Sequence, residues 1–125
     1  MNAKSPSVIG QGLEAIEATV EAAEFAARHA ESAYDRAQAA LQHALTASRR
    51  ARDAMILLQV WAVKNPPTLL QLGKACSVTE LSVRAAEKVC GEANDAYQAA
   101  LTAAREAREL RTLVSVGCAE KVAGV

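Results

Sequence analysis

The sequence predicts an all-α protein, folded as a long antiparallel hairpin of two alanine-rich, coiled-coil-like helices. Three observations lead to this fold class. Apolar residues return at alternating steps of four and three, no glycine or proline occurs between Leu13 and Lys64, and Pro66-Pro67 stands near the middle of the chain. The alternating steps average about 3.5 residues, the period of helices that pack along their length. The proline pair predicts the turn between them.

The first helix is expected over residues 11–64, after an N-terminal tail of residues 1–10. Gly10 and Gly12 disfavour an earlier start, because glycine loses the most conformational freedom in a helix. We call the repeating apolar positions the seam, and only Ser48 among them is polar in this half. The seam residues are Ile9, Leu13, Ile16, Val20, Ala23, Ala27, Ala30, Tyr34, Ala37, Leu41, Ala44, Ser48, Ala51, Met55, Leu58 and Ala62.

The turn is expected at residues 65–67 and the second helix over residues 68–116, followed by a tail of residues 117–125. Gly73 and Gly91 mark places where this helix can break, at 73–77 and at 91, and Ser77 with Glu80 fits a capping box that would restart it. Its seam residues are Leu72, Cys76, Thr79, Val83, Ala86, Cys90, Ala93, Tyr97, Ala100, Ala104, Ala107, Arg111, Val114 and Cys118.

Alanine dominates both seams, so each helix forms readily but buries little apolar area. A further apolar column flanks each seam, which favours helices that face more than one neighbour. We therefore expect self-association, most simply a dimer that forms a four-helix bundle. The oligomer seam is assigned to Ala37, Leu41, Ala44, Ala93, Tyr97 and Ala100. The alternative is a chain bent near residues 46–48 and at Gly91, which closes a short monomeric four-helix bundle.

Charge placement favours an antiparallel pairing of the two helices. The first helix begins with carboxylates and the second ends with arginines, which a turn at Pro66 brings together. The acidic residues are Glu14, Glu17, Glu21 and Glu24, and the basic ones are Arg105, Arg108 and Arg111. The same register places Arg49, Arg50 and Arg52 near Glu80 and Glu87. Exposed ion pairs are worth a fraction of a kcal/mol, so they select orientation more than they stabilise.

Composition narrows the compartment and the class of partner. Fourteen Lys and Arg balance fourteen Asp and Glu, and no basic run suggests nucleic-acid binding. No secretory signal and no membrane-spanning stretch is evident, so a cytoplasmic location is expected, although export without a cleavable signal stays open. Cys76, Cys90 and Cys118 lie too far apart on one helix to pair, which fits a reducing compartment.

No catalytic, metal-binding or cofactor-binding motif stands out, and we expect no enzyme, no metal and no cofactor. His29 and His43 lack a second ligand at the spacing of a helix-borne metal site. The antiparallel register places His43 near Cys90, and this pair is the one alternative for nucleophilic catalysis. It lacks an oxyanion turn and a third orienting group.

The turn end is the most informative place for function. Apolar residues surround the helix on both sides of the prolines, more than a two-helix tip can bury. Internal packing of this cap is one interpretation, and docking of a partner protein with Trp61 as anchor is the other. The residues assigned to partner binding are Met55, Ile56, Trp61, Leu69, Leu70 and Leu72. We expect an adaptor, chaperone-like factor, inhibitor or effector; the alternative is a helical bundle that binds a lipid or another apolar molecule.

Overall fold

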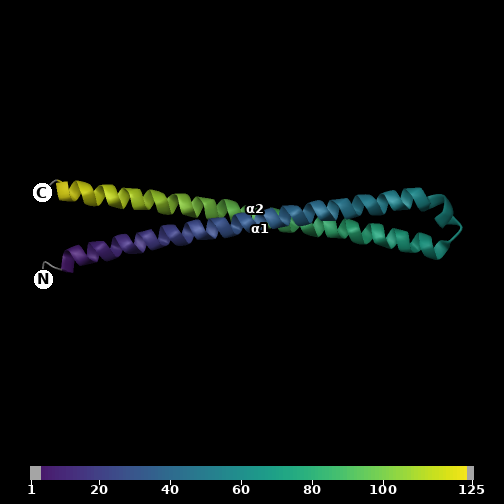
Figure 1. Cartoon of the computed structure of the whole chain (residues 1–125), viewed down its shortest axis with the longest axis horizontal. Coiled ribbons are helices and arrows are strands. Elements are labelled where there is room, and N and C mark those ends of the chain that lie inside the picture. Colours follow the sequence, from purple (N-terminus) through teal and green to yellow (C-terminus); the bar gives the residue numbers. More distant parts are fainter. Residues whose placement is uncertain (1–3, 124–125) are drawn as a thin grey trace. The chain divides into compact units, whose positions relative to one another are not determined.

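The computed structural model describes the backbone of residues 4–123 and the side-chain environments of residues 8–61 and 63–117. Two α-helices make up this part of the chain, α1 (Lys4–Val63) and α2 (Pro66–Ala123), and it contains no strand. They are joined at one end and pack against each other (Figure 1). The predicted all-α helical hairpin is confirmed.

The connection is shorter than expected, because both prolines belong to α2. Lys64 donates its backbone N–H to the Trp61 carbonyl at 3.1 Å and closes the last turn of α1. The Asn65 carbonyl accepts the first bonds of α2, from the N–H groups of Thr68 at 3.0 Å and Leu69 at 3.1 Å. Proline is favoured at the first helical position, where its missing N–H has no partner to lose. The expected turn at 65–67 is therefore corrected to residues 64–65.

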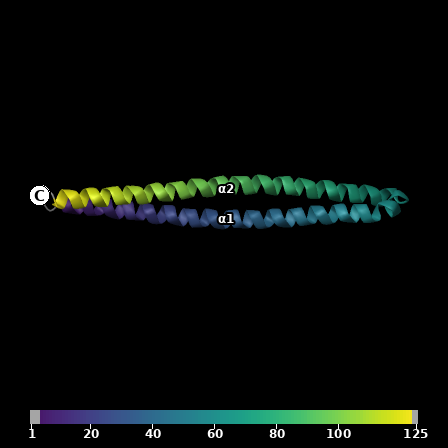
Figure 2. The ribbon, with the colours of Figure 1, turned by 90° about the horizontal axis from the view of Figure 1, so that it is seen from above.

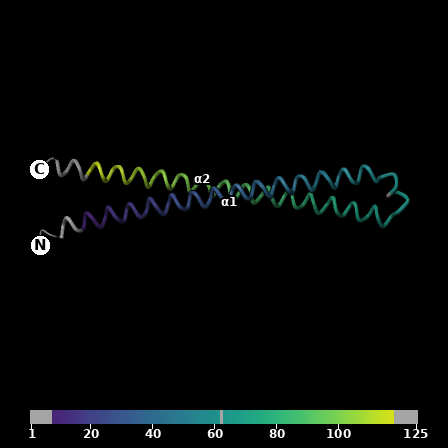
Figure 3. Tube along the Cα trace, in the orientation of Figure 1, coloured from purple at the N-terminus to yellow at the C-terminus, as the bar shows by residue number. Residues whose placement is uncertain are grey.

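The helices also extend further than the sequence predicted. α1 begins at Lys4 instead of residue 11, and α2 continues to Ala123 instead of ending at 116. α2 runs unbroken through Gly73, Ser77 and Gly91, so neither break occurs and Ser77 does not cap a helix. Regular turns continue along both Cα traces (Figure 3). Each glycine costs about 1 kcal/mol in a helix, which alanine-rich neighbours offset.

The chain divides into two compact units, and both helices contribute to each. The terminal unit consists of Met1–Ser32 and Asp95–Val125, and the turn unit of Ala33–Asn94. In both, a segment of α1 lies beside a segment of α2 that runs the opposite way (Figure 1, Figure 2).

In the terminal unit, Val20, Ala27, Ala104 and Ala107 are buried. Two ion pairs fix the register there, Arg108 to Glu24 at 3.6 Å and Arg111 to Glu17 at 3.5 Å. These pairs confirm the expected meeting of the acidic start of α1 with the basic end of α2. All four side chains remain at least one-third exposed, so each pair adds at most about 1 kcal/mol.

In the turn unit, Ala37, Ala44 and Ser48 are buried on the seam of α1. Farther toward the turn, the Cys76 thiol lies 3.7 Å from the Met55 sulfur across the two helices. This contact sets the register of the turn unit. Ser48 is only 3% exposed, and it is the one polar residue among the buried residues that the structure describes.

Burial follows the predicted seam closely. From Leu13 to Met55 every seam residue of α1 is buried or half-buried, and so is every one of α2 from Leu72 to Val114. Ile9 and Leu58, near the ends of the α1 seam, are exposed. Ala62 and Cys118 lie outside the described side chains. The heptad spacing therefore identifies the contact surface between the two helices.

The covered seam forms a thin core. Among the described residues Val20 is the largest side chain that is fully buried, and the other buried apolar residues are all alanine. Methyl groups let helix axes approach to about 8 Å, but each buries little area. We infer that high helix propensity carries much of the stability of this hairpin.

Replacing Val20 with alanine should lower the free energy of unfolding by about 2 kcal/mol, because the methyl groups it removes are fully buried. Val60→Ala is the matched control, since Val60 is 81% exposed and alanine is the better helix former. Urea unfolding followed by circular dichroism, at one fixed protein concentration, measures both. Equal losses for the two variants would contradict the assignment of Val20 to the core.

Gly91→Ala should raise the free energy of unfolding by about 0.5–1 kcal/mol. Gly91 lies inside α2, and an added Cβ meets nothing within 4 Å. Gly117→Ala, equally unobstructed but close to the end of α2, should stabilise less because helix ends fray. Thermal unfolding compares the two, and a destabilised Gly91→Ala variant would show that the glycine permits a distortion of the helix.

Candidate protein-binding surface

Large apolar side chains gather on the surface of the turn unit, close to the connection. Leu57 and Val60 of α1 are 82% and 81% exposed, and Trp61 is 54% exposed. We call this set the turn-end cluster; it consists of Ile56, Leu57, Val60, Trp61, Val63, Leu70 and Val78. A concentration of exposed apolar side chains is typical of surfaces that bind another molecule.

The six residues predicted for partner binding divide into two groups. Ile56, Trp61 and Leu70 are exposed and belong to the turn-end cluster. Met55, Leu69 and Leu72 are half-buried, with Met55 against Cys76. Their spacing explains the division. Met55 and Leu72 are seam residues, and Leu69 lies on the same side of α2, three residues before Leu72; the other three lie outside the seam. Half of the predicted set is thus partly covered within the hairpin, and the other half is exposed on its surface.

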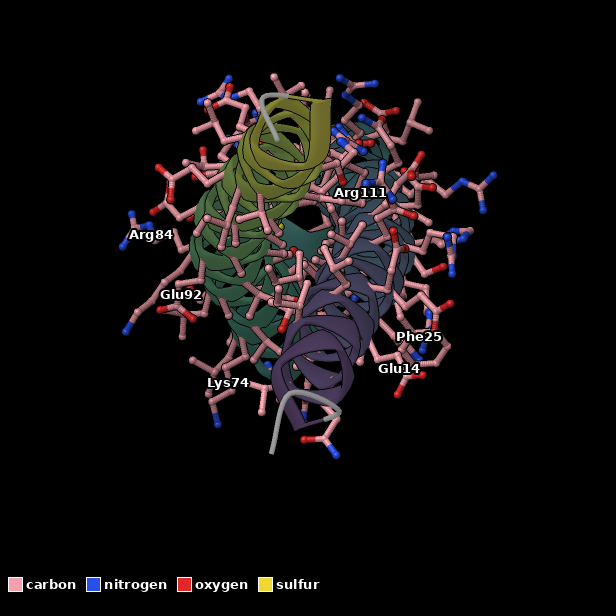
Figure 4. All side chains as sticks on the ribbon, turned by 90° about the vertical axis from the view of Figure 1, so that its left-hand side faces the viewer. Glu14, Phe25, Lys74, Arg84, Glu92 and Arg111 are labelled. Atoms are coloured by element: carbon pink, nitrogen blue, oxygen red, sulfur yellow. The ribbon has the colours of Figure 1, made fainter. Side chains whose placement is uncertain are left out.

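An open groove of about 740 Å³ lies on α2 beside the cluster. Its lining is one face of the first turns of α2: Pro66, Leu69, Leu70, Gly73, Lys74, Ser77 and Val78. Gly73 and Ser77 form the hollow because their side chains are small, and Leu70 and Val78 stand on either side. Lys74 projects outward at the edge (Figure 4).

Sequence reasoning missed Gly73, Ser77 and Val78 as surface residues of this groove. It treated glycine and serine there as a helix break, whereas an unbroken α2 places them on one face with Pro66 and Leu70. The signal was present in their spacing of three and four residues, which is the spacing of a single helix face.

A second groove of the turn unit, of about 610 Å³, is charged. Arg49, Arg52 and Arg84 line it together with Glu80 and Glu87. The predicted proximity of Arg49 and Arg52 to these two glutamates is therefore confirmed, while Arg50 lies outside the groove. Cations and carboxylates alternate here, so their charges largely compensate each other.

The residues considered for chemistry differ in their exposure. His43 is exposed on α1, whereas Cys90 is half-buried on the seam of α2. His29 lies in the terminal unit, with its ring 4.7 Å from that of Phe25. Phe25 projects outward from α1 (Figure 4). Across the described residues, no three of the His, Cys, Asp and Glu side chains gather as metal ligands would.

The seam residues assigned to an oligomer interface face the opposite helix of the same chain. Ala37 and Ala44 are buried, and Leu41, Ala93, Tyr97 and Ala100 are half-buried. In contrast, the columns that flank the seam are mostly exposed, among them Ala26, Ala33 and Ala103. The flanking columns are thus the surface more open to a second copy.

Neither described helix contains a stretch apolar and long enough to cross a bilayer. Comparison with protein families, characterised proteins and solved structures finds no significant match to this chain.

Proposed function

We propose that this chain is a non-enzymatic helical interaction protein that self-associates and binds another protein through its turn-end cluster. The observation that carries this proposal is the exposure of Leu57, Val60 and Trp61 at the turn end, where most other helical surface is alanine or charged. Desolvating such side chains on a partner is favourable by about 25 cal/mol per Å² of apolar surface.

The chemistry of the cluster favours an apolar segment of a protein as its partner. Trp61 supplies the large aromatic side chain that is common in binding hot spots. The adjacent groove is lined by α2 alone and is open, which suits an inserted side chain of a partner better than an enclosed lipid or small molecule. Cys76 and Cys90 are free thiols, which suits a reducing compartment such as the cytoplasm.

Replacing Ile56 and Val60 together with serine should weaken partner binding by at least about tenfold, since both side chains are exposed members of the cluster. Phe25→Ser is the control, because it removes a large apolar side chain that is also exposed but lies in the terminal unit. The partner is first captured with the full chain from the native host and then purified. Its affinity is measured through the emission of Trp61, the one tryptophan of the chain.

Equal affinities of the cluster variant and the wild type would overturn the assignment of the turn end. An emission shift of Trp61 on adding phosphatidylcholine or phosphatidylglycerol vesicles, with no protein bound, would replace a protein partner with a lipid surface.

A further inference from the structure

One flank of the seam carries no charged residue on either helix. On each helix this flank consists of the residues that directly precede every second seam residue, such as Ala40 before Leu41 and Val89 before Cys90. We call these residues the uncharged columns: Gly12, Thr19, Ala26, Ala33, Ala40, Ala47, Ala54 and Trp61 on α1, and Thr68, Ala75, Ser82, Val89, Ala96, Ala103, Leu110 and Gly117 on α2. At the overall charged fraction of 22%, a set of this size would contain several charges.

Within each unit, the uncharged columns of the two helices lie on the same face. The opposite flank of the seam shows this directly. In the turn unit, Arg52 of α1 and Glu80 of α2 line one charged groove. In the terminal unit, Glu24 and Arg108 line another and form an ion pair. Since the charged flanks meet on one side of the helix pair, the uncharged flanks meet on the other.

In the turn unit most of this uncharged face is open to solvent, while Ala54 and Thr68 are half-buried. Ala40, Ala47, Ser82 and Val89 are exposed, and Val89 retains 54% of its accessible surface. In the terminal unit Ala26, Ala96, Ala103 and Leu110 are likewise exposed. A helix face that stays in water normally carries charged residues, so their exclusion from both helices indicates a surface that becomes buried.

The edges of this face in the turn unit have opposite charges. The next column outward on α1 carries Arg36, His43 and Arg50 and no carboxylate. The next column outward on α2 carries Glu92 and no cation, with Gln71, Val78 and Ala85 as its other members in this unit. Glu92 projects outward from α2 (Figure 4). An edge of cations on one helix and an edge with a carboxylate on the other make the face complementary to itself.

We infer that the uncharged face of the turn unit binds a second copy of this chain, with α1 of one copy beside α2 of the other. This inference rests on the self-association in the proposed function and assigns its surface and orientation. A twofold axis parallel to the helices produces this arrangement, and the same patch then serves both copies. Small side chains allow close approach of the helices, and two uncharged faces bury no unpaired charge.

The orientation places Arg36 of one copy opposite Glu92 of the other. The Met55–Cys76 contact shows which residues of α1 and α2 lie side by side along the axis of the turn unit. Counted from this contact, Arg36 and Glu92 are displaced from each other along the axis by less than about one helical turn. If α1 instead packed beside α1 of the second copy, Arg36 and Arg50 would face the arginines on the same edge of that copy, which is unfavourable.

Ala40→Glu tests the face, with Ala39→Glu as its matched control. Both alanines are exposed neighbours on α1, but only Ala40 belongs to the uncharged columns. Sedimentation equilibrium of the full chain should give a dimer for the wild type and for Ala39→Glu. The dissociation constant of Ala40→Glu should rise at least about 100-fold, because a larger, charged side chain would be inserted between two closely packed faces. Circular dichroism verifies equal helicity beforehand.

The outcomes separate this inference from the proposed function. A wild-type chain that stays monomeric at all concentrations overturns self-association and this face together. A dimer that Ala40→Glu leaves intact overturns the face alone. A monomeric chain that still binds a partner protein through Ile56 and Val60 would leave the turn-end assignment standing.

A charge exchange tests the orientation. Arg36→Glu and Glu92→Arg should each weaken the dimer, because each places like charges opposite one another, and the double variant should recover most of the lost affinity. Sedimentation equilibrium at low and high salt measures the effect, which should shrink as salt screens the charges. A double variant as weak as the sum of the single variants would overturn the pairing of α1 with α2.

Discussion

The packing of methyl groups along the seam is the constraint on which the other features of this hairpin depend. Alanine is the commonest residue of the seam, and its small side chain lets α1 and α2 approach closely at those positions. It also leaves Val20 as the largest described side chain that is fully buried. A hydrophobic core this thin contributes little per residue, so the stability of the hairpin depends largely on helix propensity.

The charges of the hairpin are distributed to match this constraint. Ion pairs such as Arg108–Glu24 lie on one flank of the seam, where they favour the antiparallel register without being buried. The other flank is free of charge on both helices. The exposed aromatic and large aliphatic side chains of the turn unit gather near Trp61 instead of along the seam. The seam pairs the two helices, whereas the surfaces proposed for self-association and for partner binding lie outside the seam and share Trp61.

Much of this architecture follows from the sequence because a heptad period encodes it directly. The seam residues from Leu13 to Met55 are buried or half-buried, as their spacing predicts. Glu17 and Glu24 form ion pairs with Arg111 and Arg108, as the position of the turn predicts. The helix boundaries were less predictable. Proline and glycine act as local signals, but Pro66 satisfies the first turn of a helix, and the cost of Gly73 and Gly91 is small beside many alanines. The six residues predicted for partner binding include three that are half-buried and three that are exposed. Periodicity predicts which residues face the opposite helix of the hairpin, whereas the exposure of the others depends on what else lies nearby.

The absence of charge on one flank is difficult to explain by helix pairing alone. Either flank of an antiparallel pair can hold compensating charges, as the groove with Arg52 and Glu80 shows. A carboxylate at Ala40 or Ala47 would improve solubility and leave the α1–α2 contact unchanged, since both positions are exposed. Helix propensity does not require alanine there either, because glutamate and lysine are nearly as good helix formers. What distinguishes alanine at these positions is its small and uncharged side chain, which is the property that a surface packed against another helix requires.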